Sequence, residues 1–328
     1  MSKKQIFLFI LGITISIYFL IITFRNFDLD QLFNYGDSIN YFAIGSGIFL
    51  LIVSFSIRIY RWKVLLIQSF GHIKFSKLIG PFYISILANN ILPFRLGDLI
   101  RILGFNHYLG ISKEVSASSL VIERILDLLS LSLFSIIITY ILSFDILSLK
   151  TIIPVICLII IAIIIFLIYP TKILNFFLMI INQINTENHF KIALINFIMN
   201  VKTYLEQLTN NKIYLPVILI SIISWGIEAI SFYTISYSIP TLKNNLATLV
   251  AFVTGTLSTA LPSAPGYIGT FDFAITRSLM AFGNDSFDAT LYAIIVHLIL
   301  WLTPVLIGVY YVFILAKKIN YESIKNEK

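Results

Sequence analysis

Charged side chains are scarce in this chain and cysteine is almost absent. Only 12% of the 328 residues are Asp, Glu, Lys or Arg, whereas about a quarter of the residues of an average soluble domain are charged. The single cysteine, Cys157, excludes an intramolecular disulfide and a cysteine-based metal site, and we interpret it as a packing residue in an apolar run. The sequence therefore predicts neither a soluble globular domain nor a disulfide framework.

Motifs for nucleotide and metal chemistry are also lacking. The chain has no P-loop, no dinucleotide-binding glycine fingerprint, no HExxH and no carboxylate-rich metal motif. No stretch is long and polar enough for a sizeable soluble domain. These absences argue against an ATP-driven pump or a metalloenzyme, and we expect no cofactor and no metal.

Apolar sequence is what the chain has in excess. Hydrophobic residues make up 58% of it and the mean hydropathy is +0.93, which is typical of an all-α polytopic membrane protein. A membrane-spanning helix needs about 20 apolar residues. Segments of that kind lie at 5–24, 41–60, 116–142, 151–169, 213–239 and 287–316. The first resembles a signal peptide, but its apolar core is too long, so we expect a retained span.

The distribution of lysine and arginine predicts the topology. Basic residues gather at the N-terminus, between 58 and 77, between 170 and 212, and in the C-terminal tail. Cytoplasmic loops carry such residues in excess, so six full spans with both termini in the cytoplasm are expected. The net charge of +7 then reports orientation and not a nucleic-acid partner.

Two regions, 78–105 and 246–282, share a broken-helix pattern. Leu92, Pro93 and Gly97 recur with the same spacing as Leu261, Pro262 and Gly266. Matching Pro and Gly interruptions in the two halves of a transporter point to its binding site. We expect two re-entrant hairpins in an inverted-repeat arrangement. The alternative is that each region is a pair of short complete spans, which gives ten crossings and preserves the inversion.

Charged residues follow Asn90 in the first broken region and begin the span after it. They are Arg95, Asp98, Arg101, Glu123, Arg124 and Asp127. Ionisable groups at membrane depth normally pair or face a cavity, so we expect one closed network in which Arg95 and Asp98 are helical neighbours. This network is predicted to bind a phosphate-bearing headgroup, because Arg matches phosphate with two donors. An ion-pair lock and snorkelling interfacial charges remain as alternatives.

The second broken region carries helix breakers, hydroxyls and small residues. Its candidate contact residues are Pro262, Ser263, Pro265, Gly266, Gly269 and Asp272. Such a loop presents backbone amides and hydroxyls to a ligand. Asp272 or Thr270 is expected to N-cap the returning helix, whose N-terminus favours an anion. Kinking alone would explain any single Pro or Gly here, but not the cluster.

Other polar residues allow two interpretations each. Glu228 and His297 lie alone in apolar spans and are candidates for a proton relay or a counter-charge to arginine, with a neutral buried residue as the simpler interpretation. Arg58, Tyr60, Arg61 and Trp62 are interpreted as an aromatic and basic interfacial anchor. Apolar residues at helical spacing predict a cytoplasmic surface helix over 172–210, or a connector resting on the bundle.

The motifs together resemble a known family. They are Arg58-x-x-Arg61-Trp62, Asn90-x-x-Pro93-x-Arg95-x-Gly97-Asp98-x-x-Arg101, Glu123-Arg124-x-x-Asp127 and Pro262-x-x-Pro265-Gly266-x-x-Gly269. The chain is similar to the transmembrane region of lysylphosphatidylglycerol synthase, also described as a flippase-like domain. The resemblance implies one transmembrane domain over 1–328 that moves a lipid headgroup between leaflets. We expect a standalone member without the aminoacyl-transferase domain of the full synthases.

The leading hypothesis is therefore a lipid transporter in the cytoplasmic membrane of a bacterium or archaeon. Its substrate would be an anionic phospholipid or, since standalone members of the family are associated with polyprenyl-linked glycan pathways, a polyprenyl-phosphate-linked lipid. One rival is an intramembrane lipid-modifying enzyme with Glu123, Asp127 or His297 as acid or base. The other is a noncatalytic subunit for a glycosyltransferase. A lipid-synthesising enzyme is a possible partner under the leading hypothesis.

Overall fold

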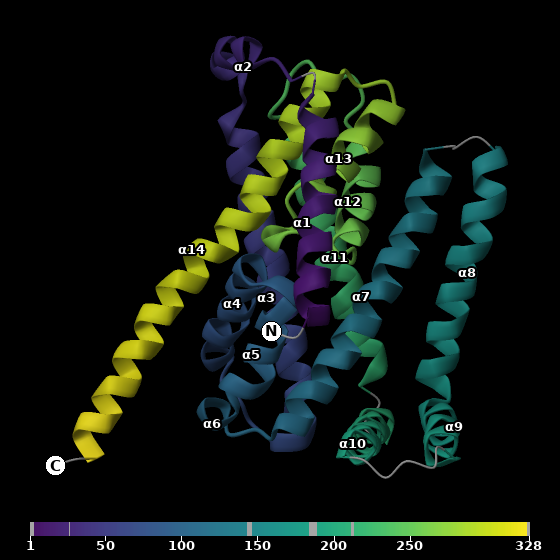
Figure 1. The fold of residues 1–328 in the computed structure, drawn as a ribbon, viewed down its shortest axis with the longest axis vertical. Coiled ribbons are helices and arrows are strands. Elements are labelled where there is room, and N and C mark those ends of the chain that lie inside the picture. The colour runs from purple at the N-terminus through teal and green to yellow at the C-terminus, as the bar shows by residue number, and fades with distance from the viewer. Residues whose placement is uncertain (1–2, 26, 143–145, 184–188, 211–212, 327–328) are drawn as a thin grey trace. The chain divides into compact units, whose positions relative to one another are not determined.

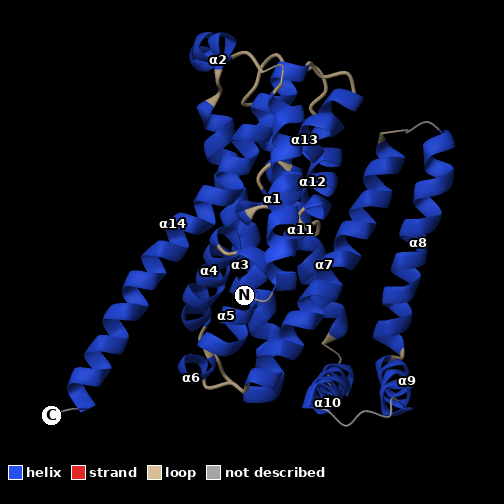
Figure 2. Ribbon diagram, viewed as in Figure 1, coloured by secondary structure: helices blue, strands red, loops and turns tan. Residues whose placement is uncertain are grey.

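The computed structural model describes the chain except for residues 1–2, 26, 143–145, 184–188, 211–212 and 327–328. Every regular element among the described residues is a helix, and none is a strand (Figure 2). The all-α class expected from the sequence is confirmed.

Contacts divide the chain into two compact units. The first unit comprises Met1–Phe55, Ile79–Ile100 and Gly226–Lys328, and the second comprises Ser56–Leu78 and Arg101–Trp225. Two long helices, α3 (Tyr41–Phe70) and α11 (Tyr214–Ser236), contribute residues to both.

The first unit is built around helix α13 (Thr270–Ala281). It packs against α1 (Lys3–Phe24), α12 (Ala247–Ser258) and α14 (Ser286–Asn326) (Figure 1). A short helix, α2 (Leu29–Tyr35), follows α1. This packing holds the second broken region between α12 and α13 against α1 and α14.

The first broken region interrupts a helix as predicted. Helix α4 (Phe75–Ile91) ends before Pro93, and a 3-10 turn (Pro93–Arg95) leads into α5 (Leu96–Gly104). Leu92 is extended, with φ −97° and ψ 144°, a conformation that the ring of the following proline favours over the helical one. The backbone therefore reverses here and does not continue as one helix.

Gly97 makes that reversal possible. A Cβ atom at position 97 would collide with the carbonyl oxygen of Ser85 and with Asn89 on α4. Because glycine has no Cβ, the start of α5 lies directly against the backbone of α4.

The second broken region contains two turns that favour glycine. A 3-10 turn (Pro265–Tyr267) separates α12 from α13. Gly266 has φ 71° and Gly269 has φ 88°, and both values lie in the left-handed range that L side chains rarely adopt. A Cβ at Gly269 would also meet the carbonyl of Ser16 on α1.

The second unit is a set of helices that contact one another in sequence order. They are α7 (Lys113–Ile141), α8 (Ile146–Ile168), α9 (Pro170–Gln183) and α10 (His189–Asn210), preceded by the short α6 (Asn106–Leu109). Helix α10 returns to pack on α7 (Figure 1). The segment expected to form one surface helix over 172–210 thus forms two, on either side of residues outside the described range.

Three helices are long and apolar enough to cross a membrane among the described residues: Tyr41–Ile67, Tyr214–Ser236 and Ser286–Ala316. They coincide with three of the expected spans. Two consecutive helical stretches, Ile156–Phe166 and Pro170–Gln183, are together long and apolar enough to cross a membrane. The angle between them is 92°. Shorter apolar helices lie at Ile10–Phe24 and Ala247–Ser258.

Candidate functional site

The two broken regions line one pocket in the first unit. The pocket has a volume of about 340 Å³. The first region contributes Asn89, Leu92, Pro93 and Arg95, and the second contributes residues 259–267. We call this cavity the loop pocket. The two repeated sequence patterns therefore meet in space, although they lie far apart in the chain.

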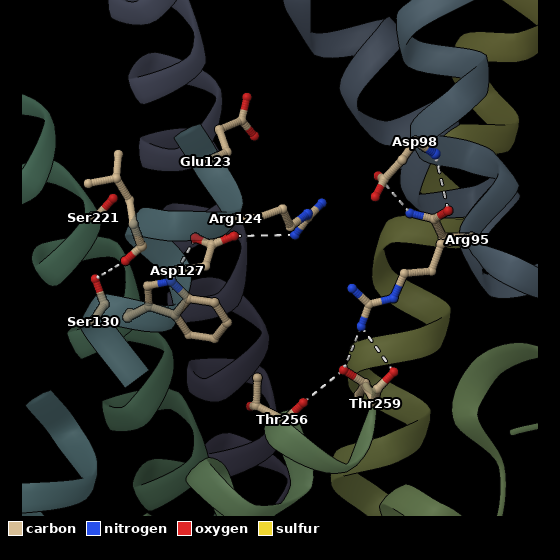
Figure 3. A network of polar contacts seen from close by, with 12 residues as sticks. Arg95, Asp98, Glu123, Arg124, Asp127, Ser130, Ser221, Thr256 and Thr259 are labelled. Atoms are coloured by element: carbon tan, nitrogen blue, oxygen red, sulfur yellow. Dashed lines mark hydrogen bonds and ion pairs between the residues drawn. The ribbon is translucent and has the colours of Figure 1, made fainter. Parts of the chain in front are cut away.

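Arg95 connects the two walls of the loop pocket. Its Nη2 donates to the carbonyl oxygen of Thr259 at 3.0 Å and to the Thr259 hydroxyl oxygen at 3.2 Å (Figure 3). The Thr259 hydroxyl in turn donates to the carbonyl oxygen of Thr256 at 2.7 Å. The guanidinium carbon of Arg95 lies 5.9 Å from the ring centre of Tyr267. A cation is thus fixed by neutral acceptors at the rim of the second loop.

No carboxylate neutralises Arg95 within the described part of the chain. It is the one charged residue among those lining the loop pocket, and among the described residues it donates hydrogen bonds to Thr259 alone. Asp98 exchanges hydrogen bonds with Asn89: the Asn89 amide donates at 3.1 Å, and the Asp98 N–H donates back at 3.2 Å. The expected pairing of Arg95 with Asp98 was wrong, because Arg95 lies in a turn before α5 and the helical three-residue spacing does not apply.

Backbone strain is concentrated at the same place. Arg95 has φ 53° and Tyr267 has φ 61°, and these are the non-glycine residues with positive φ among those described. Each such conformation costs on the order of 1–3 kcal/mol and persists only where surrounding contacts hold it. One strained residue lies on each wall of the loop pocket.

The second wall is anchored to α1. Of the residues predicted for this loop, Pro262, Ser263, Pro265 and Gly266 line the pocket. The N–H of Ala264 donates to the Ser16 hydroxyl at 2.7 Å. The main chain of the loop is therefore held by a neighbouring helix, with its polar face left to the pocket.

Asn90, predicted as a site residue, has its backbone carbonyl beside Gly266. Its neighbour Asn89 lines the pocket instead. The sequence offers two adjacent asparagines, and only the helical phase of α4 decides between them.

His297 on α14 contacts the same loop from a second cavity. Its Nε2 lies 2.8 Å from the Gly266 carbonyl oxygen and its Nδ1 lies 2.7 Å from Asp272 Oδ1. Asp272 Oδ2 accepts the N–H of Gly269 at 2.9 Å. Asp272 therefore caps α13 from its third residue and Gly269 occupies the cap position, whereas the sequence reasoning placed Asp272 or Thr270 there. The second cavity measures about 330 Å³.

A separate ionic cluster in the second unit is centred on Asp127. Oδ1 of Asp127 accepts from Arg61 Nη1 at 2.8 Å and from the Trp225 indole N–H at 2.9 Å. Oδ2 accepts from Arg124 at 3.2 Å (Figure 3). Arg61 also donates to the Ser221 hydroxyl at 2.6 Å. The carboxylate is thus shared by two cations and an indole.

Glu123 extends this cluster one turn along α7. It accepts from Arg101 Nη2 at 2.9 Å and forms a longer ion pair with Arg61 at 3.9 Å. Arg101 lies over the ring of Trp62, 4.7 Å from its centre. Arg61 and Trp62 are 2% and 0% exposed, whereas Tyr60 is 50% exposed. The interpretation as an interfacial anchor was therefore wrong for Arg61 and Trp62. The role of Arg61 could have been inferred from Glu123 and Asp127, two carboxylates on one face of α7. Two buried carboxylates there need more cations than α7 itself supplies.

Comparison with known proteins agrees with this architecture. Residues 9–308 match the family described as the lysylphosphatidylglycerol synthase TM region. The chain belongs to this family. It is also 29% identical over 247 residues to the UPF0104 membrane protein MJ1078 of Methanocaldococcus jannaschii, a match that covers 73% of this chain and 98% of that protein. No solved structure matches the chain.

The resemblance drawn from the motifs is therefore confirmed, and this member of the lysylphosphatidylglycerol synthase TM-region family is membrane-embedded. The motif residues fall into two groups. Pro93, Arg95, Pro262 and Gly266 meet at the loop pocket, and the arginines and carboxylates of the second unit pair with one another.

Glu228, predicted as a proton relay or counter-charge, lies on α11. It is 6% exposed and accepts from the Ser54 hydroxyl at 3.3 Å. Its role as a proton relay stays a prediction.

Proposed function

We propose that this protein moves a phosphate-bearing lipid headgroup between membrane leaflets, and that the loop pocket binds the headgroup. The acyl chains would stay in the surrounding lipid during transfer. An anionic phospholipid and a polyprenyl-phosphate-linked lipid share the phosphate that this pocket would recognise. Membership of a family named for a phospholipid synthase supports a lipid-related role.

The unneutralised charge of Arg95 carries the proposal. A partly buried guanidinium without a carboxylate costs several kcal/mol of solvation that an anion would restore. Its guanidinium has five N–H donors, and Nη2 is the group that donates to Thr259. A phosphate oxygen would find the remaining donors of Arg95 on one side and the hydroxyl of Ser263 on the other wall.

The other predicted phosphate ligands are assigned a different role. Arg101 and Arg124 are paired with Glu123 and Asp127, which supports the ion-pair lock that the sequence left as an alternative. The same pairing argues against Glu123 or Asp127 as the acid or base of a lipid-modifying enzyme. We therefore propose Arg95 as the phosphate ligand, with Arg101, Glu123, Arg124 and Asp127 stabilising the helices of the second unit.

The topology expected from the sequence fits this proposal. Six full spans, two re-entrant regions related by inversion and two cytoplasmic termini would let the loop pocket open to either leaflet. The protein would then act in the cytoplasmic membrane as a single transmembrane domain, and an enzyme that makes the lipid would be its natural partner.

Purified protein in liposomes tests the proposal. Tail-labelled phosphatidylglycerol and a tail-labelled polyprenyl phosphate would be compared with phosphatidylcholine, with and without a proton gradient, by quenching the label in the outer leaflet. We expect quenching of the inner-leaflet pool for at least one anionic lipid, and recovery of that lipid chemically unchanged. A changed lipid species would support the enzyme hypothesis, and no movement of any anionic lipid would refute transport.

Substitutions of Arg95 connect transport to the pocket. Losing a buried charge-assisted contact costs about 3 kcal/mol, so Arg95→Gln should weaken anionic-lipid binding on the order of 100-fold. Arg95→Lys keeps the charge and should retain part of the activity. Arg277→Gln on α13 is the matched control, because Arg277 is exposed. Transport by Arg95→Gln at the rate of the control would exclude Arg95 as the phosphate ligand.

A further inference from the structure

The imidazole of His297 holds the second wall of the loop pocket through two hydrogen bonds. One reaches the carbonyl oxygen of Gly266, and the other reaches Asp272, which itself holds the N–H of Gly269. Gly266 and Gly269 are the two positive-φ glycines that shape this loop. The loop is therefore fastened at both of its turns by one His–Asp pair.

The chemistry of these contacts fixes the number of protons on the pair. A carbonyl oxygen only accepts, so Nε2 of His297 must carry a hydrogen. The contact of 2.7 Å between Nδ1 and Asp272 Oδ1 holds one more, on either the imidazole or the carboxyl. Asp272 Oδ2 is already an acceptor for Gly269. The observed geometry is satisfied when the pair shares a single proton besides that on Nε2.

Few other groups compete for that proton. The cavity beside His297 is lined by Leu20 and Phe24 from α1, by Ile268, by Asp272, and by Ile294, Leu298 and Trp301 of α14 itself. Asp272 is the one titratable residue in this lining. The ring of Phe271 on α13 lies 4.9 Å from the imidazole ring. Apart from Asp272 and His297 itself, no described residue that lines this cavity is charged or titratable.

We propose that His297 and Asp272 form a proton-operated latch that positions the Gly266–Gly269 loop and so controls the loop pocket. His297 and Asp272 are positioning residues, since the residues that line the loop pocket do not include them. The effect of the latch on lipid movement rests on the function proposed above. The existence of the latch does not rest on that function, because the latch is defined by hydrogen bonds to the loop.

Loss or gain of a proton breaks the latch in different ways. When the shared proton leaves to water, a neutral imidazole faces the Asp272 carboxylate or the Gly266 carbonyl with a lone pair, and one of the two bonds is lost. When a proton is added, the carboxyl becomes a donor on Oδ1 or Oδ2, and Asp272 releases His297 or Gly269. Either change frees one turn of the loop.

Thiol labelling of the loop reads the latch without measuring transport. Cys157 is the single cysteine, so Cys157→Ser followed by Ser263→Cys gives one thiol in the loop pocket. Its modification by a small methanethiosulfonate reagent would be followed between about pH 5 and pH 8, the range in which histidine titrates. The same thiol in a His297→Gln background is the reference, because Gln does not titrate and the intrinsic pH dependence of the thiol cancels in the ratio.

We expect the ratio of rates to pass through a minimum and to rise about fivefold on at least one side, the factor that corresponds to about 1 kcal/mol for one hydrogen bond. Asp272→Asn is the second variant. Its amide can donate to Nδ1 and accept from Gly269, so it should abolish the rise on the alkaline side.

A ratio that stays flat across this range would overturn the latch. So would a rise on the alkaline side that is the same in Asp272→Asn as in the unsubstituted pair. If transport depends on Arg95 but the ratio of labelling rates does not change with pH, the latch would be overturned and the proposed function would stand. A pH-dependent ratio without movement of any anionic lipid would refute the proposed function and leave the latch standing.

Discussion

Replacing Asp127 with asparagine should destabilise the protein far more than removing its exposed partner Arg124. Asparagine has nearly the same shape, and its remaining oxygen can still accept from Arg61 and Trp225. What is lost is the charge. Arg61 is 2% exposed and its next carboxylate, on Glu123, lies 3.9 Å away, so the substitution leaves a buried cation poorly compensated.

The expected loss of stability depends on how deeply each cation that binds the Asp127 carboxylate is buried. Breaking a buried pair by removing one partner costs about 3–5 kcal/mol. We expect about 3 kcal/mol for Asp127→Asn, at the lower end of that range, because Glu123 remains within reach of Arg61. The side chain of Arg124 is 44% exposed, and pairs of this kind contribute less than about 1 kcal/mol. Arg124→Gln is therefore the matched control.

Titration with sodium dodecyl sulfate in mixed micelles, followed by far-ultraviolet circular dichroism, would give both free energies of unfolding. A double substitution, Arg61→Met with Asp127→Asn, should cost less than the sum of the single ones, because it removes the stranded cation. Equal losses for Asp127→Asn and Arg124→Gln, or additivity in the double variant, would refute the reasoning.

Two further predictions concern stability: the first tests a close packing contact and the second tests a buried hydrogen bond. Gly97→Ala places a Cβ on the carbonyl oxygen of Ser85, so we expect a displaced first loop, a loss of about 1–3 kcal/mol and no stabilisation by anionic lipid in a thermal melt. Gly45→Ala, where nothing lies within 4 Å, should leave both measurements unchanged or raise stability slightly. Tyr204→Phe removes a buried hydrogen bond of 2.9 Å to the Leu65 carbonyl, and chemical unfolding should show a loss of about 1–2 kcal/mol. A Tyr204→Phe protein as stable as the original would show that this bond contributes nothing.

The helical class and the two interruptions were predictable because their causes are local. Pro93 disfavours the helical conformation at Leu92, and Gly266 and Gly269 permit turns with positive φ that other residues rarely adopt. Proline alone does not mark a break, since Pro81 and Pro304 lie inside continuous helices. The spacing shared by the two regions also pointed to one site, and the loop pocket brings both regions together.

The partners of the charged residues were less predictable, because they depend on contacts between distant segments. Arg61 and Asp127 are 66 positions apart in the chain, and His297 and Asp272 are 25 apart. Local reasoning paired Arg95 with Asp98 because it assumed that the residues after Pro93 already have helical spacing. The positive φ of Arg95 cannot be inferred from an arginine, since this conformation is held by packing and not by the residue type.

The contrast between the two groups of arginines bears on function. Arg61 and Arg101 lie among carboxylates and hydrogen-bond acceptors, as expected where a charge only supports the fold. Arg95 combines an unneutralised charge with a left-handed backbone, and Tyr267 adds a second strained residue across the same pocket. Stability alone would favour glycine at such backbone positions and a carboxylate near the cation. Two departures from stability at one cavity are what we expect under the proposed function, in which an anionic headgroup enters and leaves this pocket.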